Sequence, residues 1–109
     1  MSFEVALEGI KLSKELNQHR HYAIANQMLR SSTSIGANVR EAQYPESRRD
    51  FYHKMKIAAK ETGETQYWLE LIELSGIETV SNDFKKLVND THWIIMKILE
   101  STKKGMAKK

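Results

Sequence analysis

The stretch of sequence that decides the fold runs from Leu29 to Leu74, LRSSTSIGANVREAQYPESRRDFYHKMKIAAKETGETQYWLELIEL. Two helical patterns meet within it at Pro45, the only proline of the chain. A proline biases the residue before it towards extended geometry, and Glu46 or Ser47 can then open a new helix. The sequence therefore predicts two helices joined by a tight turn.

On both sides of Pro45, apolar and small residues recur at alternating steps of four and three, which keeps one helix face against its neighbours. Before the turn, from about Tyr22 to Ala42, this pattern comprises Ile24, Met28, Ser31, Ile35, Asn38 and Ala42. After the turn, from about Ser47 to Leu74, it comprises Phe51, Met55, Ala58, Thr62, Thr65, Leu69 and Ile72. A second pattern, about 100° around the later helix, comprises Ile57, Glu61, Glu64, Trp68 and Leu71. Two patterns predict two neighbours, which are either two helices of one bundle or one helix and a second subunit.

Two further helices are predicted outside this stretch. The first runs from about Phe3 to Leu16. Its apolar residues are Phe3, Leu7 and Ile10 on one side, with Val5, Leu12 and Leu16 overlapping that side. The last runs from about Asp83 to Ser101, after a helix stop at Gly76 and an N-cap in Ser81-Asn82-Asp83. Its apolar face comprises Phe84, Leu87, Thr91, Ile94 and Ile98, flanked by Val88, Ile95 and Leu99.

This organisation predicts an all-α fold, an antiparallel up-down four-helix bundle formed by residues 1–102. Residues 103–109, KKGMAKK, are expected to be a basic, frayed C-terminal tail, with phosphate attraction through Lys103, Lys104, Lys108 and Lys109 as a second interpretation. The 109 residues suffice for one domain, and the absence of cysteine excludes disulfides and thiolate metal sites. Glu4 and Glu8 interrupt the N-terminal apolar pattern, which argues against a signal peptide, and no uncharged run approaches membrane-spanning length. A cytoplasmic protein without a membrane role is expected.

The motifs LRSSTSIGANVREAQ, SRRDF and IAAKETGETQYWLEL occur in this order, and their combination resembles the bacterial four-helix-bundle proteins encoded by intervening sequences within large-subunit ribosomal RNA genes. The resemblance covers nearly the whole chain and extends to relatives of the accessory variability protein of diversity-generating retroelements. It implies a four-helix bundle, often a homopentameric barrel, with a proposed role in nucleic-acid binding and no enzymatic activity.

The charges of the third predicted helix are segregated along its length. Its first half holds Arg48, Arg49, Lys54, Lys56 and Lys60, and its second half holds Glu61, Glu64, Glu70 and Glu73. One interpretation is structural, since a basic half can pair with an acidic neighbouring helix. The other is an anion-binding end, in which the helix N-terminus, Arg48 and Arg49 hold phosphate and Arg40, Lys54 and Lys56 extend the surface. A ring of subunits would repeat such an end and multiply its salt-sensitive affinity.

Arg30 and Arg40 lie on one face of the second predicted helix. Either arginine could extend the basic surface or pair with Glu61 or Glu64, and the pairing is preferred because buried charges are rarely left alone. Arg30, Glu61 and Glu64 are therefore predicted to form polar contacts between helices or subunits. Trp68 is predicted to be buried in the core or at a subunit interface in preference to stacking on a base.

Signals for catalysis and metal binding are weak. A di-metal bundle needs paired Glu-x-x-His motifs, whereas this chain offers only Asp50-x-x-His53. The small residues from Ser31 to Gly36 lack the order of a phosphate-binding loop. No enzyme activity, cofactor, metal or small-molecule substrate is expected. Two hypotheses remain: a homo-oligomeric bundle that binds RNA or DNA, and a protein-protein scaffold or adaptor.

Overall fold

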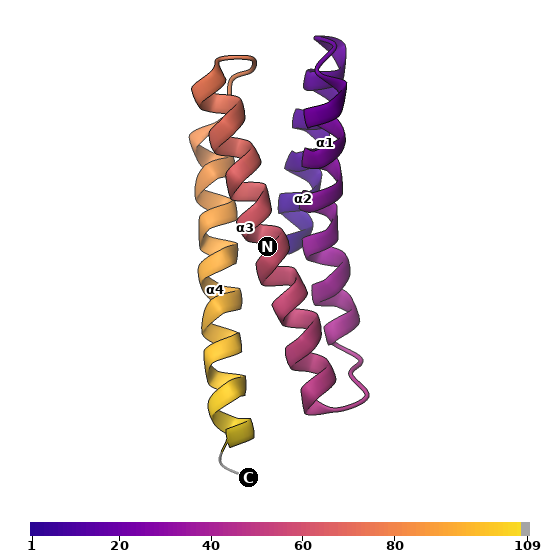
Figure 1. Ribbon diagram of the computed structural model, residues 1–109, viewed down its shortest axis with the longest axis vertical. Helices are drawn as coiled ribbons and strands as arrows, with labels where there is room; N and C mark the ends of the chain where they lie inside the picture. The colour runs from indigo at the N-terminus through magenta and orange to yellow at the C-terminus, as the bar shows by residue number, and fades with distance from the viewer. Residues whose placement is uncertain (108–109) are drawn as a thin grey trace.

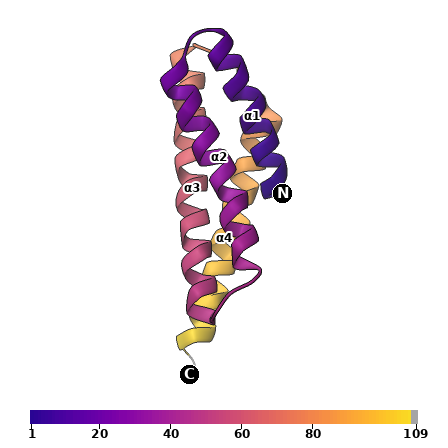
Figure 2. The same cartoon turned by 90° about the vertical axis from the view of Figure 1, so that its right-hand side faces the viewer.

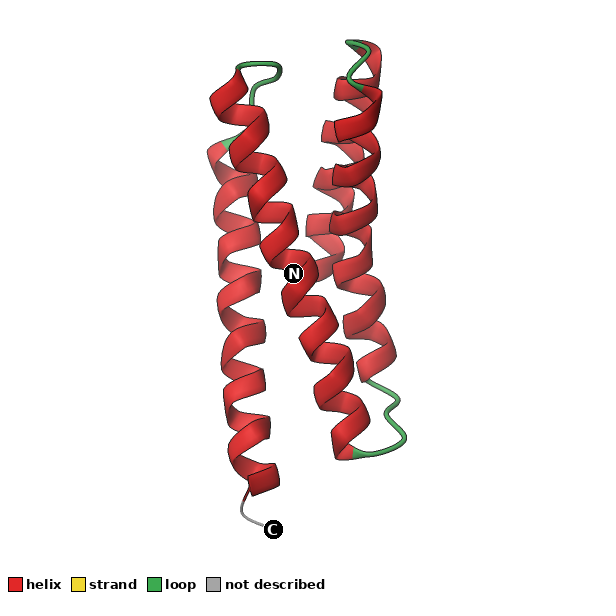
Figure 3. Ribbon diagram, viewed as in Figure 1, coloured by secondary structure: helices red, strands yellow, loops and turns green. Residues whose placement is uncertain are grey.

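Four antiparallel helices form an elongated bundle of 52 × 21 × 18 Å in the computed structural model, which describes residues 1–107 (Figure 1). The helices are α1 (Ser2–Gln18), α2 (Tyr22–Ala42), α3 (Arg48–Ser75) and α4 (Asn82–Ala107). Short loops join them, and the described part of the chain contains no strand (Figure 3). The all-α prediction is thereby confirmed, and the predicted limits of the first three helices are correct to within two residues.

The helix ends follow local chemistry. Ser47 precedes α3, and its hydroxyl accepts a hydrogen bond from the Asp50 amide at 3.0 Å. Gly76 ends the same helix with φ of 73°, a left-handed conformation that glycine adopts at little cost. The Ser81 hydroxyl accepts from the Phe84 amide at 3.1 Å and caps α4.

Helix α4 is longer than predicted. It continues past Ser101 to Ala107, so residues 103–107 are helical and do not form a frayed tail. Two hydrogen bonds support this extension. Within α4, Thr102 Oγ1 donates to the Ile98 carbonyl at 2.7 Å, and from α3, Arg48 donates to the Gly105 carbonyl at 3.2 Å. Lys108 and Lys109, the remainder of the predicted tail, lie outside the described residues.

The core follows the predicted patterns of α2 and α3 closely. In α3 the first pattern is buried from Met55 to Ile72, with Phe51 half-buried. In α2, Met28, Ser31, Ile35 and Ala42 are buried. In α4 the buried set shifts by part of a turn, because Val88, Ile95 and Leu99 join Phe84 and Thr91 in the core while Ile94 is exposed.

The prediction for α1 is wrong in one respect. Val5, Leu12 and Leu16 are buried, whereas Phe3, Leu7 and Ile10 are exposed. At 100° per residue the second set points almost directly away from the first, so the two do not overlap. Helix α1 therefore has two apolar faces, and only one of them is covered.

Each helix packs mainly against its neighbour in sequence, whereas α1 touches α4 only sparsely. Helix α1 is also short, and its N-terminus lies about halfway along the bundle (Figure 2). Its packing on α2 is close because Gly9 has no side chain: a Cβ at Gly9 would lie 1.9 Å from the Ser32 hydroxyl. Below the start of α1, the last turns of α2 remain uncovered.

Candidate nucleic-acid interface

The basic residues predicted to bind nucleic acid lie towards one end of the bundle, where α2 ends and α3 begins. Arg48 is the first residue of α3 and donates to the Gly105 carbonyl near the end of α4 at 3.2 Å. This hydrogen bond satisfies a carbonyl in the last turn of α4. The helix dipole also favours a cation at that end of a helix. Arg48 thus joins α3 to α4 within the subunit.

The N-terminus of α3 is partly capped by local side chains. The Ser47 hydroxyl accepts from the Asp50 amide, and the Asp50 carboxylate accepts from the Glu46 amide at 3.1 Å. These two contacts place a hydroxyl and a negative charge where a bound phosphate would otherwise lie. The candidate anion site is therefore better described by side-chain charges than by the helix N-terminus.

Lys54 faces α2 and lies 3.4 Å from a carboxylate oxygen of Glu41. The pair is partly exposed and links the end of α2 to the first half of α3. This contact is the structural role that the sequence left open for the basic half of α3. Lys54 is consequently less available to an external anion than its neighbours.

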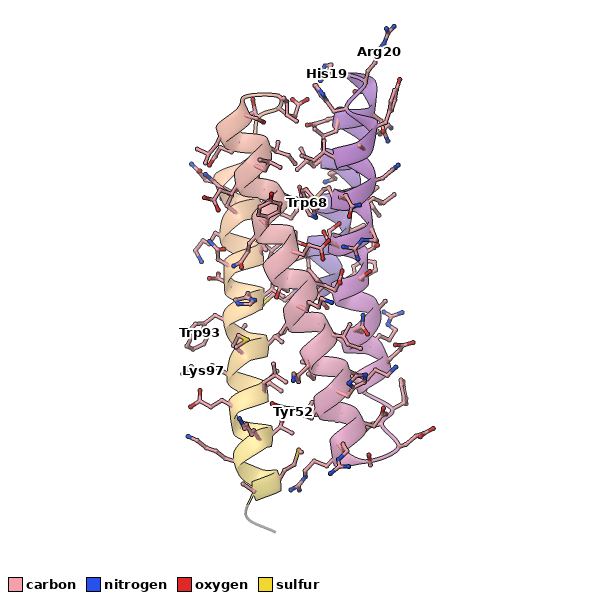
Figure 4. All side chains as sticks on the ribbon, viewed as in Figure 1. His19, Arg20, Tyr52, Trp68, Trp93 and Lys97 are labelled. Atoms are coloured by element: carbon pink, nitrogen blue, oxygen red, sulfur yellow. The ribbon has the colours of Figure 1, made fainter. Side chains whose placement is uncertain are left out.

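Arg49 and Lys56 lie on the outer face of α3, together with Lys60. All three side chains are exposed, and none has an acidic partner within 4.0 Å among residues 1–107. Steps of seven and four residues keep them on one line along the helix. Lys56 also lies 5.8 Å from the ring centroid of Tyr52, which is labelled on the lower half of α3 in Figure 4. Arg40 and Arg48 also lack an acidic partner among residues 1–107, so what distinguishes the outer line is that three such cations share one exposed helix face.

Arg40 lies apart from that line. It lines a groove of about 830 Å³ below the start of α1, together with Phe3, Gly36 and Tyr44 among others. The groove exists because α1 begins near Gly36, so the last turns of α2 are uncovered. Arg40 forms no ion pair with Glu61 or Glu64, so it does not make the interhelix contact that the sequence allowed for Arg30 or Arg40.

Arg30 makes that interhelix contact. Its guanidinium donates to Glu61 at 2.8 Å and also to Glu64, so one arginine of α2 bridges two acids of α3. The hydrogen bond to Glu64, followed by that to Glu61, raises the pKa of Arg30 despite some desolvation. Glu61 is only 7% exposed, so this partner neutralises a buried charge.

The same interface extends through hydroxyl and indole groups. Thr65 Oγ1 lies 2.8 Å from the Glu61 carbonyl and 2.9 Å from Ser31 Oγ, an arrangement in which threonine donates to the carbonyl and accepts from serine. Trp68 is half-buried, donates from Nε1 to Glu64 at 3.3 Å, and meets the edge of Tyr67 at 5.0 Å between ring centroids (Figure 4). Trp68 is thus held by the α2–α3 contact of its own subunit.

Two exposed apolar features were missed at the level of sequence. Trp93 is 62% exposed and projects from α4 with Lys97, whose ammonium lies 5.4 Å from the indole centroid (Figure 4). The exposed face of α1, formed by Phe3, Leu7 and Ile10, is the other. A helical projection of α4 shows Trp93 opposite the main apolar stripe, whereas a projection of α1 shows two apolar faces and does not tell which one is exposed.

Two further kinds of feature are absent from the described residues. No group of three or more potential metal-ligating side chains occurs within residues 1–107. Across that same range, no helix has both the length and the apolar character needed to span a bilayer. Surface charge and exposed apolar residues therefore remain the features to interpret.

Comparison with known proteins places this geometry in a family. The family model described as "23S rRNA-intervening sequence protein" matches residues 1–100. The chain belongs to the 23S rRNA-intervening sequence protein family. A solved structure from Bacteroides thetaiotaomicron, described as a protein of unknown function from the S23 ribosomal protein family, is similar to it at 42% identity, with 92% of each chain covered and a TM-score of 0.75. No curated protein matches the chain. The match identifies this four-helix bundle as that of the 23S rRNA-intervening sequence proteins. A biochemical role has to be inferred from the residues at its surface.

Proposed function

We propose that the protein is a non-enzymatic, homo-oligomeric four-helix bundle of the cytoplasm that binds nucleic acid, RNA or DNA, through backbone phosphates. The observation that carries the proposal is the outer line of Arg49, Lys56 and Lys60, whose charges have no acidic partner in the described chain. Contacts of lysine and arginine with phosphate release counterions, and this release supplies sequence-independent affinity. The name of the family, which refers to 23S ribosomal RNA, agrees with such a ligand.

Assembly is proposed from the apolar surface of α1. Phe3, Leu7 and Ile10 are between 45% and 62% exposed and form a stripe opposite the buried face. Contiguous exposed apolar residues on a small domain mark contact surfaces. A pentamer is the expected assembly on family resemblance, and a ring would repeat the outer line of cations five times. Light scattering of the purified protein tests this expectation, and a monomer mass at tens of micromolar would contradict it.

Salt-titrated binding tests the nucleic-acid proposal. Arg49→Gln/Lys56→Gln is expected to weaken binding to structured RNA or duplex DNA at least tenfold near 100 mM salt and to reduce the log–log salt slope by roughly 1.4 to 1.8 for each chain that contacts the nucleic acid. Lys85→Gln/Lys86→Gln removes the same charge from the start of α4, where both lysines already have acidic partners, and is the matched control. No binding by the native protein even near 50 mM salt would refute the proposal.

The alternative function is a protein-protein scaffold or adaptor, favoured by the same apolar stripe of α1. Arg49→Glu/Lys56→Glu separates the two functions, because neither residue contacts another helix by ion pair or hydrogen bond within residues 1–107. Loss of nucleic-acid binding with the assembly mass unchanged supports the nucleic-acid function. Loss of assembly with these two substitutions supports the scaffold.

A further inference from the structure

The outer face of α3 contains a glycine that the fold of the subunit does not explain. A Cβ added to Gly63 would meet no atom within 4 Å apart from its own helix. Gly9, in contrast, is required by Ser32, and Gly76 by its positive φ. Glycine is among the poorest helix formers, and Gly63 lies near the middle of a 28-residue helix. Gly36 and Gly105 would also accept a Cβ, at ordinary contact distances of 3.5 Å, so Gly63 differs from the other glycines within the described helices in facing open space, where another molecule can approach the backbone closely.

Gly63 lies on the same line as the unpaired cations. Starting at Arg49, steps of four and three residues pass through His53, Lys56, Lys60 and Gly63 and end at Tyr67. Residues at these steps share one face of a helix. Arg49, His53, Lys56, Lys60 and Tyr67 are all exposed. The line is about 27 Å long at 1.5 Å per residue, and it leads from positive charge, past an open stretch of backbone, to an aromatic ring.

The aromatic end of the line is held in place. Tyr67 is 56% exposed, and its ring makes a T-shaped contact with Trp68 at 5.0 Å between centroids. Trp68 is anchored in turn by its hydrogen bond to Glu64, which Arg30 also contacts. Tyr67 therefore offers a ring whose position is set by the α2–α3 interface, and such a ring can stack on a flat ligand at little entropic cost.

We propose that the outer face of α3 binds a single-stranded segment of nucleic acid, with phosphates at Arg49, Lys56 and Lys60, closest backbone approach at Gly63 and an unpaired base on Tyr67. This inference rests on the proposed function and narrows its ligand. Single-strand sites combine a basic track with aromatic stacking platforms. In a duplex the bases stack on one another, so Tyr67 would have no partner. A line of 27 Å suits the short end of the roughly 4 to 16 nucleotides that single-strand sites cover.

The test compares a labelled 12-nucleotide RNA of mixed sequence with a perfect 12-base-pair duplex, by fluorescence anisotropy at 50 mM salt. The native protein is expected to bind the single strand at least fivefold more tightly. Tyr67→Ala should weaken single-strand binding about tenfold and leave duplex binding within twofold. The control is Tyr22→Ala, at an exposed tyrosine of α2.

Gly63→Leu tests the close approach. It should weaken single-strand binding at least fivefold while raising the thermal midpoint, because leucine favours a helix and its Cβ would meet no atom within 4 Å at this position. The control is Ala23→Leu, which adds similar bulk at an exposed helix position of α2. A rise in the midpoint shows that the variant is folded, so that a loss of affinity can be assigned to the contact.

The outcomes separate this inference from the broader proposal. Equal affinity for single strand and duplex, with Gly63→Leu and Tyr67→Ala unchanged, overturns the inference while nucleic-acid binding stands. A change of assembly mass in Gly63→Leu identifies the face as a contact between subunits and likewise overturns it. Absence of binding to either RNA refutes the proposed function and the inference together.

Discussion

The two halves of α3 use charge in different ways. In the second half, Glu61 and Glu64 are bridged by Arg30, and Glu73 lies 2.6 Å from Lys85. In the first half, Arg49, Lys56 and Lys60 face outward without an acidic partner in the described chain. Ion pairs between helices help to position those helices. Exposed charges of one sign without a partner stabilise the fold no more than neutral polar residues would. The paired acids join α3 to its neighbours, whereas these three cations remain available at the surface.

The largest stability effect is expected from Arg30→Met. The substitution leaves Glu61, which is 7% exposed, without its cation, and an uncompensated buried charge is costly. Since Arg30 is itself half-exposed, we expect a loss of about 2 to 3 kcal/mol in the free energy of unfolding, measured with urea. Arg30→Met/Glu61→Gln should recover part of that loss. A loss below about 0.5 kcal/mol would show that the acidic half is not structural.

A smaller loss is expected from Thr65→Val. The buried hydroxyl lies between the Glu61 carbonyl and the Ser31 hydroxyl, so its removal leaves the Ser31 hydroxyl without this partner. We expect the free energy of unfolding to fall by about 1 to 2 kcal/mol. Ser31→Ala/Thr65→Val removes both groups and should be closer to the native value. If the double variant were as unstable as the sum of the two single variants, the hydroxyls would not be coupled.

Lys85→Met removes an ion pair at the surface of the acidic half. Both side chains of the Lys85–Glu73 pair are about one-third exposed or more, so solvent weakens the attraction. The free energy of unfolding should fall by no more than about 0.5 kcal/mol, and 0.5 M NaCl should reduce the difference from the native protein. Lys54→Met, which breaks the pair with Glu41, is a matched comparison at the other end of α3.

The smallest effect is expected from Arg49→Gln, and its sign is opposite. Arg49 is the second residue of α3, where the helix dipole disfavours a cation, and it has no acidic partner among residues 1–107. Thermal or urea unfolding should show a gain of about 0.3 kcal/mol. Arg49→Lys keeps the charge and should show no gain. A measurable loss in Arg49→Gln would mean that this cation stabilises the subunit.

The helices and most of the core could be predicted from the sequence, because apolar periodicity and capping chemistry are local. Ser47, Gly76 and Ser81 act at the predicted positions. The two faces of α1 could not be assigned in the same way. Phe3 and Val5 belong to two apolar patterns that both have helical periodicity. Only the position of α2 decides which of the two faces is buried.

The candidate site shows the same limit more sharply. Lys54 and Lys56 are two residues apart, yet the first pairs with Glu41 across the α2–α3 contact and the second faces outward. Composition treats them alike, and only the rotation of α3 about its axis distinguishes them. The role of Arg48 is likewise visible only when the end of α4 is placed beside it, because Gly105 lies 57 positions away.

The sparse contact between α1 and α4 has a consequence for how the chain folds. Nearly all of the packing joins helices that follow one another, so few contacts need the two ends of the chain to meet. Low contact order of this kind is associated with fast folding, on a scale of microseconds to milliseconds for helical bundles. The contacts between α1 and α2 involve residues 2–42 alone, so this hairpin can form before α4 is available.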